Sequence, residues 1–449
     1  MSTKIRNKLI DLGPEKLADA LLELASHYDE ADELVKRLVA TPKEKVKRFK
    51  SKLTGLKRAR RFIDWREAGG FARELSGLLA DLAESVEDGK TGVELVARFF
   101  ECDRSVFDRC DDSSGMVGDI FRYDASELFS RFAADCPNKK WLANLLIKLF
   151  GGNDYGVRDY LLESAAKFMP EENIRELAGK FWQLAEAEKD EHHGRSWYRG
   201  VEELAVQLGD APLFEKARLA AWGEQPGTAA CLDIADMYLK NGEVQTALDW
   251  IERDKEPGSF QEDKRDNLLQ AIYTELGESD KVTEIAWKRF RAYRSVQSLE
   301  KLLTVIGQEQ KEAVIVKQAQ EIMAKKRFIE SDAEFLLQTG CLDQAENYLL
   351  QSAEQFNGDF YDSLLPLAQA MEKAKRLLAA SMLYRALLDS ILKRGYTKSY
   401  PHGVRYLKKL DTLSLAINDW QRFTSHKIYK KDLRLAHGRK YSFWGKYDK

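Results

Sequence analysis

Proline, glycine and cysteine are all scarce in this chain. Of its 449 residues, 9 are proline, 28 are glycine and 5 are cysteine. So few turn-forming residues argue against a β-rich or disordered protein and favour a helical one. The cysteines, at positions 102, 110, 136, 231 and 341, are odd in number and irregularly spaced. This pattern argues against a disulfide framework and predicts reduced thiols.

Long hydrophobic runs are also missing. No apolar stretch reaches the roughly 18 residues that a membrane-spanning helix needs, and the N-terminal sequence MSTKIRNKLIDLG lacks the apolar core of a signal peptide. We therefore expect a cytoplasmic protein without a membrane partner. The length allows two to four compact domains or one long repeat array.

Common catalytic signatures do not occur. The sequence has no Walker A loop, no GxGxxG motif after a strand, no GxSxG elbow and no HExxH motif. No cysteine or histidine pair has the CxxC or CxH spacing of a zinc site. We therefore expect no metal and no cofactor, and an enzyme would have to be of an unrecognised type.

A net charge of −2 conceals a strong segregation of charge. Residues 43–66 carry 11 lysines or arginines against 2 acids, and residues 393–449 carry 15 against 4. The stretch 67–392 therefore holds a net charge of −20. Basic ends that flank an acidic middle predict an anionic partner, or self-association through attraction between ends and middle.

A repeat of about 33 residues runs through the second half of the chain. In residues 231–259, small Ala235 lies seven residues before Gly242, Tyr238 four before, Ala247 five after and Ile251 nine after. Related patterns surround positions 209, 277, 307, 340 and 375, where the fit at 307 is poorer and position 375 holds lysine in place of glycine. This spacing is typical of helix-turn-helix repeats of the tetratricopeptide type, whose glycine closes the first helix in a left-handed conformation.

The predicted fold is therefore all-α, a tetratricopeptide-like helical-repeat solenoid with a concave inner surface and an irregular helical N-terminal region. Generic antiparallel helices without superhelical stacking are the alternative. In the N-terminal region we expect helices over residues 17–40, 43–66, 71–86, 92–110 and 124–136.

Four segments are predicted. Residues 1–95 form a helical N-terminal region with the basic helix 43–66, and residues 96–190 form helical layers with an Asp/Ser turn. Residues 191–392 hold the repeats, and residues 393–449 form basic, aromatic C-terminal helices.

The stretch ECDRSVFDRCDDSSG, residues 101–115, combines two cysteines with four aspartates. An EF-hand loop with Gly115 in sixth position would place Cys110 first and Phe121 twelfth, where calcium requires an oxygen ligand and a glutamate. Cys102 and Cys110 would lie about 12 Å apart on one helix, too far to share a zinc ion. We therefore expect buried thiols in a helix, followed by a turn in which Asp112 or Ser113 caps a helix near Met116.

The aspartates near this turn have a functional alternative. Arg158 could pair with Asp119 or Asp112 from the preceding layer. In that case one polar pocket, suited to an enzyme of unrecognised type, would be lined by Asp111, Asp112, Asp119, Arg158 and Asp159.

Nucleic-acid or other polyanion binding is the hypothesis that the basic segments suggest, because cations bind phosphates and aromatic residues stack on unpaired bases. The simpler interpretation of His437 is a helix end before Gly438. The candidate residues are Lys57, Arg58, Arg60, Arg61, Arg434, His437, Arg439 and Lys440.

The segment GVRYLKKLDTLSLAINDWQRFTSHKIYKKDLRLAHGRKYSFW, with RCDDSSGMVGDIF and DYGVRDYL, resembles an uncharacterised bacterial family catalogued as a domain of unknown function. The final helices are also similar to the ends of helical-repeat proteins that carry SWIM zinc fingers, although the SWIM cysteines and histidine are absent here. The resemblance implies an α-helical repeat fold without an assigned activity. Together with the repeats, it predicts a non-enzymatic protein-binding scaffold in a multicomponent bacterial system, with nucleic-acid binding as the alternative.

Overall fold

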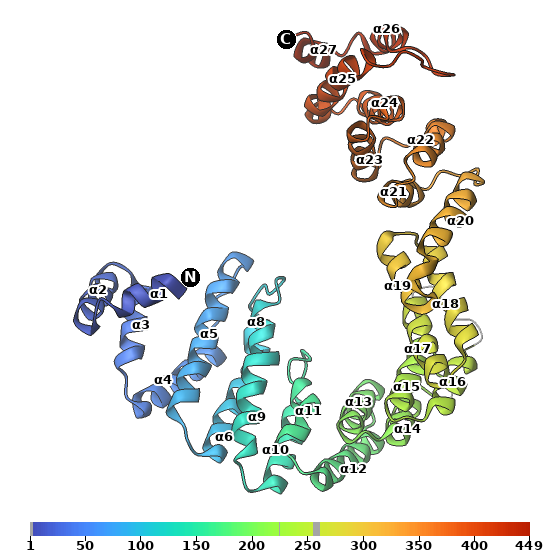
Figure 1. The fold of residues 1–449 in the computed structure, drawn as a ribbon. Helices are drawn as coiled ribbons and strands as arrows, with labels where there is room; N and C mark the ends of the chain where they lie inside the picture. The colour runs from blue at the N-terminus through green and yellow to red at the C-terminus, as the bar shows by residue number, and fades with distance from the viewer. Residues whose placement is uncertain (1–2, 224, 255–260) are drawn as a thin grey trace. The chain divides into compact units, whose positions relative to one another are not determined.

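The computed structural model describes residues 3–223, 225–254 and 261–449, and it is built of helices (Figure 1). Within these ranges the one β-type contact is an isolated parallel bridge between Ile63 and Cys110. The chain divides into two compact units, unit 1 over residues 1–268 and unit 2 over residues 269–449. The predicted all-α helical-repeat solenoid is confirmed. The division between residues 268 and 269 does not coincide with any boundary between the four predicted segments. Those boundaries stay a prediction.

The helices of unit 1 begin with the irregular N-terminal region and continue into regular hairpins. They are α1 (Thr3–Ile10), α2 (Pro14–His27), α3 (Asp29–Val39), α4 (Pro42–Arg58), α5 (Trp65–Ser85), α6 (Gly89–Phe100), α7 (Asp103–Phe107), α8 (Met116–Asp119), a π-helical turn (Ile120–Ala125), α9 (Ser126–Ala134), α10 (Lys139–Gly151), α11 (Tyr160–Glu163), α12 (Glu171–Ala187), α13 (Glu191–Leu208), α14 (Ala211–Trp222), α15 (Thr228–Lys240) and α16 (Val244–Arg253). The division between the units falls inside α17 (Glu262–Glu275).

The helices of unit 2 form successive hairpins up to the C-terminal region. They are α18 (Ser279–Ala292), α19 (Val296–Ile306), α20 (Lys311–Met323), α21 (Glu330–Gln338), α22 (Leu342–Gln351), α23 (Tyr361–Lys373), α24 (Leu377–Arg394), α25 (Tyr400–Ser414), α26 (His426–His437) and α27 (Tyr441–Tyr447). In the repeats, α21 packs on α23, while α20 packs on α22 and α22 on α24. From α20 to α24, helices that are two apart along the chain therefore contact each other, whereas α14 packs on α15 and α18 packs on α19.

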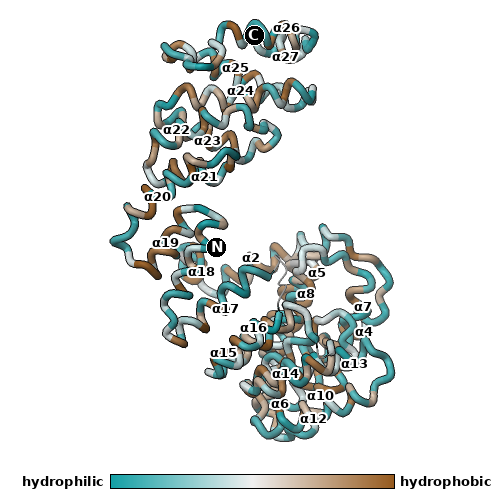
Figure 2. Tube along the Cα trace, turned by 90° about the vertical axis from the view of Figure 1, so that its right-hand side faces the viewer, coloured by the Kyte–Doolittle hydropathy of each residue, from teal (hydrophilic) through white to brown (hydrophobic). Residues whose placement is uncertain are grey.

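Each unit buries its own hydrophobic core. The core of unit 1 includes Phe99, Phe121 and Phe181, and the core of unit 2 includes Phe335 and Phe443. Figure 2 shows hydrophobic residues recurring along the helices between hydrophilic ones. This is the amphipathic pattern that makes a helical hairpin unstable alone and stable when it is stacked on neighbours.

The hinge positions of the repeat adopt the conformation that the sequence predicts. All six have positive φ: 62° at Gly209, 79° at Gly242, 73° at Gly277, 100° at Gly307, 81° at Gly340 and 60° at Lys375. At five of them the next residue donates its N–H to the carbonyl five residues before it, as Cys341 does to Leu336 at 2.8 Å. This is the Schellman closure of a helix. Gly307 is the exception, and it is also the hinge whose surrounding sequence fits least well.

Lys375 is strained because a side chain disfavours the left-handed conformation by about 1–2 kcal/mol. We expect Lys375→Gly to raise the free energy of unfolding of the full chain by about 1 kcal/mol, once the greater flexibility of glycine in the unfolded state is subtracted. Urea unfolding measures the change. Lys375→Ala retains the Cβ atom and is the matched control, so a glycine variant no more stable than the alanine variant would contradict the expectation.

Several expected helix boundaries in the N-terminal region are wrong. The helix expected over residues 17–40 is interrupted at Tyr28, whose φ of −135° is extended. The expected end near residue 40 is right, since α3 ends at Val39, and Thr41 begins the next helix because its Oγ1 accepts from the Glu44 N–H while Glu44 accepts from the Thr41 N–H. This reciprocal capping box starts α4.

The next three expected helices also differ. The basic helix ends at Arg58, and the chain that follows forms the bridge at Ile63. The helix expected from residue 71 starts at Trp65, because the Asp64 side chain caps it by accepting from the Arg66 N–H at 3.0 Å. The helix expected over residues 92–110 is broken between α6 and α7. The side-chain cap at Asp64 therefore sets the start of α5, and Gly69 and Gly70, which precede the expected start, lie inside the helix.

Candidate binding surfaces

A groove crosses successive first helices in unit 2. Two adjoining depressions of about 400 and 530 Å³ share Tyr293, Ser331, Glu334 and Gln338. Their walls come from the start of α19, from α21 and from α23. We call this surface the first-helix groove.

Apolar side chains lie between the polar ones in the first-helix groove. Phe335 and Leu367 are buried beneath it, Leu337 is half-buried, and Tyr293 is 67% exposed. An exposed aromatic ring beside small and apolar residues is a common feature of surfaces that bind other proteins.

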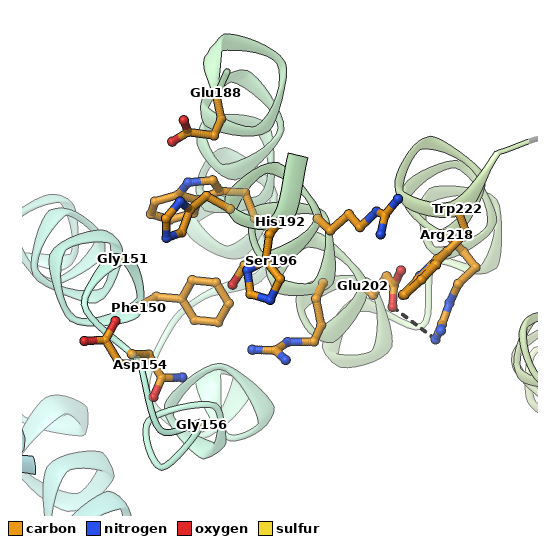
Figure 3. A pocket seen from close by; sticks show the side chains of 15 residues that line it. Phe150, Gly151, Asp154, Gly156, Glu188, His192, Ser196, Glu202, Arg218 and Trp222 are labelled. Atoms are coloured by element: carbon orange, nitrogen blue, oxygen red, sulfur yellow. Dashed lines mark ion pairs between the residues drawn. The ribbon is translucent and has the colours of Figure 1, made fainter. Parts of the chain in front are cut away.

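A second depression, of about 710 Å³, lies along α13 in unit 1 (Figure 3). Three arginines line it, and each already has an acidic partner. Arg195 pairs with Glu191, and Arg199 lies 3.2 Å from Asp159. Arg218 lies 3.0 Å from Glu202, the pair joined by a dashed line in Figure 3, and 3.2 Å from Asp233. Because these charges are paired within the chain, the depression offers no surplus of one sign to a ligand.

Glu202 is the most perturbed acid in this depression. It is 5% exposed. Burial raises the pKa of its carboxyl group to about 7, with a small further rise from Glu203 and Asp233, while Arg218 opposes the shift. Neutral pH therefore lies within the titration range of a buried carboxyl group at the contact between α13 and α14.

The predicted Asp/Ser turn forms and caps a helix. The Asp112 carboxylate accepts from the N–H groups of Val117 at 2.9 Å and Gly118 at 2.7 Å, at the start of α8. Asp111 accepts from the Ser113 N–H at 3.1 Å. The capping role expected for Asp112 is therefore confirmed, and both carboxylates bind backbone of their own turn.

Asp119 lies near an arginine other than Arg158, and Asp159 also lies near an arginine. Arg122 Nη1 lies 3.6 Å from Asp119 Oδ1. Asp159 accepts from Asn153 at 2.5 Å and lies near Arg199. Burial raises the pKa of Asp159, and the charges of Arg199 and Arg122 oppose that rise.

Arg158 does not pair with Asp119 or Asp112, and that expectation is wrong. Its guanidinium binds Asp103 through two parallel contacts, Nε to Oδ2 at 2.8 Å and Nη2 to Oδ1 at 2.7 Å. It also donates to the carbonyls of Leu149 and Phe100, in the last turns of α10 and α6. Both side chains of the pair are buried. Arg158 therefore joins three helices and satisfies carbonyls that helix ends leave unpaired.

The five residues of the predicted polar cluster thus each have a partner, and none of them lines the depression along α13. We propose structural roles for all five.

The cysteines are buried or half-buried thiols. Cys102, Cys110, Cys136 and Cys231 are buried and Cys341 is half-buried. Burial raises the pKa of Cys102 to about 11. Across the described ranges no group of three or more His, Cys, Asp or Glu residues is placed to hold a metal ion.

The basic residues at the end of α4 are exposed and partly paired. Lys57 lies 3.3 Å from Glu101, and Arg61 pairs with Glu67. Arg58 and Arg60 are exposed, and no ion pair of theirs occurs in the part of the chain that the structure describes. Of the four candidate polyanion-binding residues in unit 1, Arg58 and Arg60 therefore remain as exposed cations without an acidic partner in the described part of the chain.

The basic residues of the C-terminal set lie in unit 2. Arg434 lies 2.7 Å from Asp448 and packs over the Trp444 ring at 4.6 Å. His437 ends α26, as its sequence predicts, and its carbonyl accepts from the Trp444 indole at 2.9 Å. Burial and the charge of Lys440 lower its pKa. Arg439 is exposed.

Two features, one buried and one on the surface, were not expected from the sequence. The ion pair between Arg158 and Asp103 joins positions 55 apart, and the first-helix groove gathers residues from three repeats. Two sequence features are consistent with the groove: the repeat of about 33 residues, which stacks equivalent helices, and the acidic composition of residues 67–392. For Asp103, an acid in the first turn of a short helix, the sequence carries no comparable signal.

No helix in the described part of the chain is long and apolar enough to cross a membrane.

Comparison with known proteins identifies a family for this chain but no relative with a described activity. No curated protein matches the sequence. One solved structure, a "circular tandem repeat protein with novel repeat topology and enhanced subunit contact surfaces", is 15% identical over 95% of this chain and 92% of its own, with a TM-score of 0.15. At that score it carries no structural argument.

The sequence model of a family of unknown function (DUF6880) matches residues 2–207 and residues 199–446. These overlapping matches span almost the whole chain and confirm the resemblance drawn from its motifs. They do not test the similarity of the tail to SWIM-associated proteins. The chain belongs to the DUF6880 family.

Proposed function

We propose that the chain is a non-enzymatic, protein-binding scaffold or adaptor that acts in the bacterial cytoplasm as part of a multicomponent system. The observation that carries the proposal is the first-helix groove, which continues across three successive first helices and exposes Tyr293. Stacked repeats that align equivalent helix faces form extended surfaces suited to segments of other proteins.

A photo-crosslinking residue tests the proposal in cells that produce the protein. Gln338 lies in the groove, whereas Gln320 lies on the second helix α20, and both are exposed. We expect a benzophenone amino acid at position 338 to give a discrete covalent adduct with another protein and the same residue at position 320 to give none. Equal adducts from both positions, or none from position 338, would count against a scaffold that works through this groove.

Nucleic-acid binding is the second candidate. It is favoured by Arg58 and Arg60, which are exposed and form no ion pair within the described part of the chain. It is the weaker one because Lys57, Arg61 and Arg434 pair with carboxylates of the chain. A DNA or RNA shift at physiological salt that disappears when Lys57, Arg58, Arg60 and Arg61 are replaced by glutamate would move the assignment to this candidate.

A further inference from the structure

The first-helix groove is strongly acidic. Four carboxylates line it, those of Glu300 on α19, Glu330 and Glu334 on α21, and Asp362 on α23. Within the described ranges none of the four takes part in an ion pair, and Glu300, Glu334 and Asp362 are exposed. Carboxylates on three neighbouring helices therefore face one surface without a cation from the chain.

The one arginine that lines the groove within the described chain does not neutralise it. Arg294 is 8% exposed, and its guanidinium lies 3.2 Å from Glu321 and 3.4 Å from Asp332. It also donates to Gln318 at 2.7 Å. Its charge is thus paired with two acids that do not line the groove, and the four groove carboxylates present a net negative field.

The dimensions of the groove suit an extended chain. Packed helices lie about 8–10 Å apart, so the path from α19 across α21 to α23 is roughly 20 Å, the length of about six extended residues. Side chains that alternate along such a segment could place cations against the carboxylates and apolar groups against Tyr293 and Leu337.

We infer that the first-helix groove receives an extended segment of a partner protein that is rich in lysine or arginine. The inference rests on the proposed scaffold function and adds the chemistry of the partner. Acidic walls attract a basic segment and repel an acidic one, so charge sets the specificity of the groove and the apolar floor contributes affinity.

Fluorescence anisotropy of the full-length protein with two labelled nine-residue peptides tests the inference. The peptides have the sequences GKAKYKAKG and GEAEYEAEG. We expect the lysine peptide to bind at least about tenfold more tightly than the glutamate peptide, and its affinity to fall as salt rises, because several charge pairs form on binding.

Variants with matched charge locate the binding. Glu300→Lys with Glu334→Lys changes two groove positions, whereas Glu312→Lys with Glu354→Lys changes two exposed acids outside it by the same net charge. The groove pair should weaken binding of the lysine peptide about tenfold, and the control pair less than about twofold, because exposed charges far from a ligand are screened. Circular dichroism checks that both variants fold.

Three results would overturn the inference: equal affinity for both peptides, equal loss in both double variants, or binding only of the glutamate peptide. If crosslinking at position 338 still captures a partner, such a result contradicts the inference that the partner segment is basic. It does not contradict the proposed scaffold function. If the crosslinked protein is a second copy of this chain joined through residues 393–449, the occupant is the protein's own basic tail, and the inference of a separate partner is wrong.

Discussion

Arg158→Met should lower the free energy of unfolding by about 3–5 kcal/mol, because it leaves the Asp103 carboxylate buried without its counter-charge. The Asp103 side chain is 1% exposed and the Arg158 side chain 7%. The substitution also removes donors from the Leu149 and Phe100 carbonyls at two helix ends. We expect earlier urea unfolding and faster amide exchange in α6, α7 and α10.

Two further variants separate the ion pair from ordinary loss of packing. Arg122→Met removes an exposed arginine that pairs with Asp119 and should cost less than about 1 kcal/mol. Adding Asp103→Leu to Arg158→Met should recover a large part of the loss, because an apolar pair of similar size needs no counter-charge. If the double variant were less stable than Arg158→Met alone, the unpaired carboxylate would not be the cause.

Glu202→Gln should become increasingly favourable as the pH rises. The pKa of Glu202 is raised from 4.5 to about 7 in the folded chain. The folded state therefore binds the proton more tightly than the unfolded state, and stability is lost between about pH 4.5 and 7 as the buried carboxyl group ionises. Glutamine resembles the protonated form and does not ionise. The difference in free energy of unfolding, variant minus wild type, should rise by roughly 2–3 kcal/mol between pH 5 and 8.

Tryptophan fluorescence during urea unfolding can measure this difference, since Trp197 and Trp222 line the same depression. Glu191→Gln is the control, because that carboxylate is exposed and pairs with Arg195 on the surface. A pH-independent difference for Glu202→Gln, or an equal slope for Glu191→Gln, would show that Glu202 does not govern the pH dependence of unit 1.

The repeats were predictable because their signals are local. A glycine, or Lys375 in its place, closes each first helix through contacts within about six residues, so a constant spacing is enough to reveal it. The N-terminal helices were less predictable. There the boundaries follow side-chain caps at Thr41 and Asp64 and an extended residue at Tyr28, and each of these competes with a hydrophobic pattern that continues past it.

The candidate sites were predictable only in part. Asp112 caps the helix as expected, since that contact lies within its own turn. The partner of Arg158 was not predictable, because two suitable aspartates lie at similar distances in sequence and only packing selects Asp103. The groove depends on which helix faces align across three repeats, and a single sequence records their period but not their relative rotation.

The charges of α4 have a consequence for assembly. Its cations contact acids of nearby segments: Lys45 meets Glu84, Arg48 meets Glu33, Lys52 meets Glu74 and Lys57 meets Glu101. Helical hairpins with similar apolar faces could stack in the wrong order during synthesis, since hydrophobic contact alone discriminates poorly between them. Each pair contributes little to stability, but the four acids come from three separate segments, so a displaced α4 would lose all four contacts together. The charges of α4 therefore favour one placement of this helix against its neighbours.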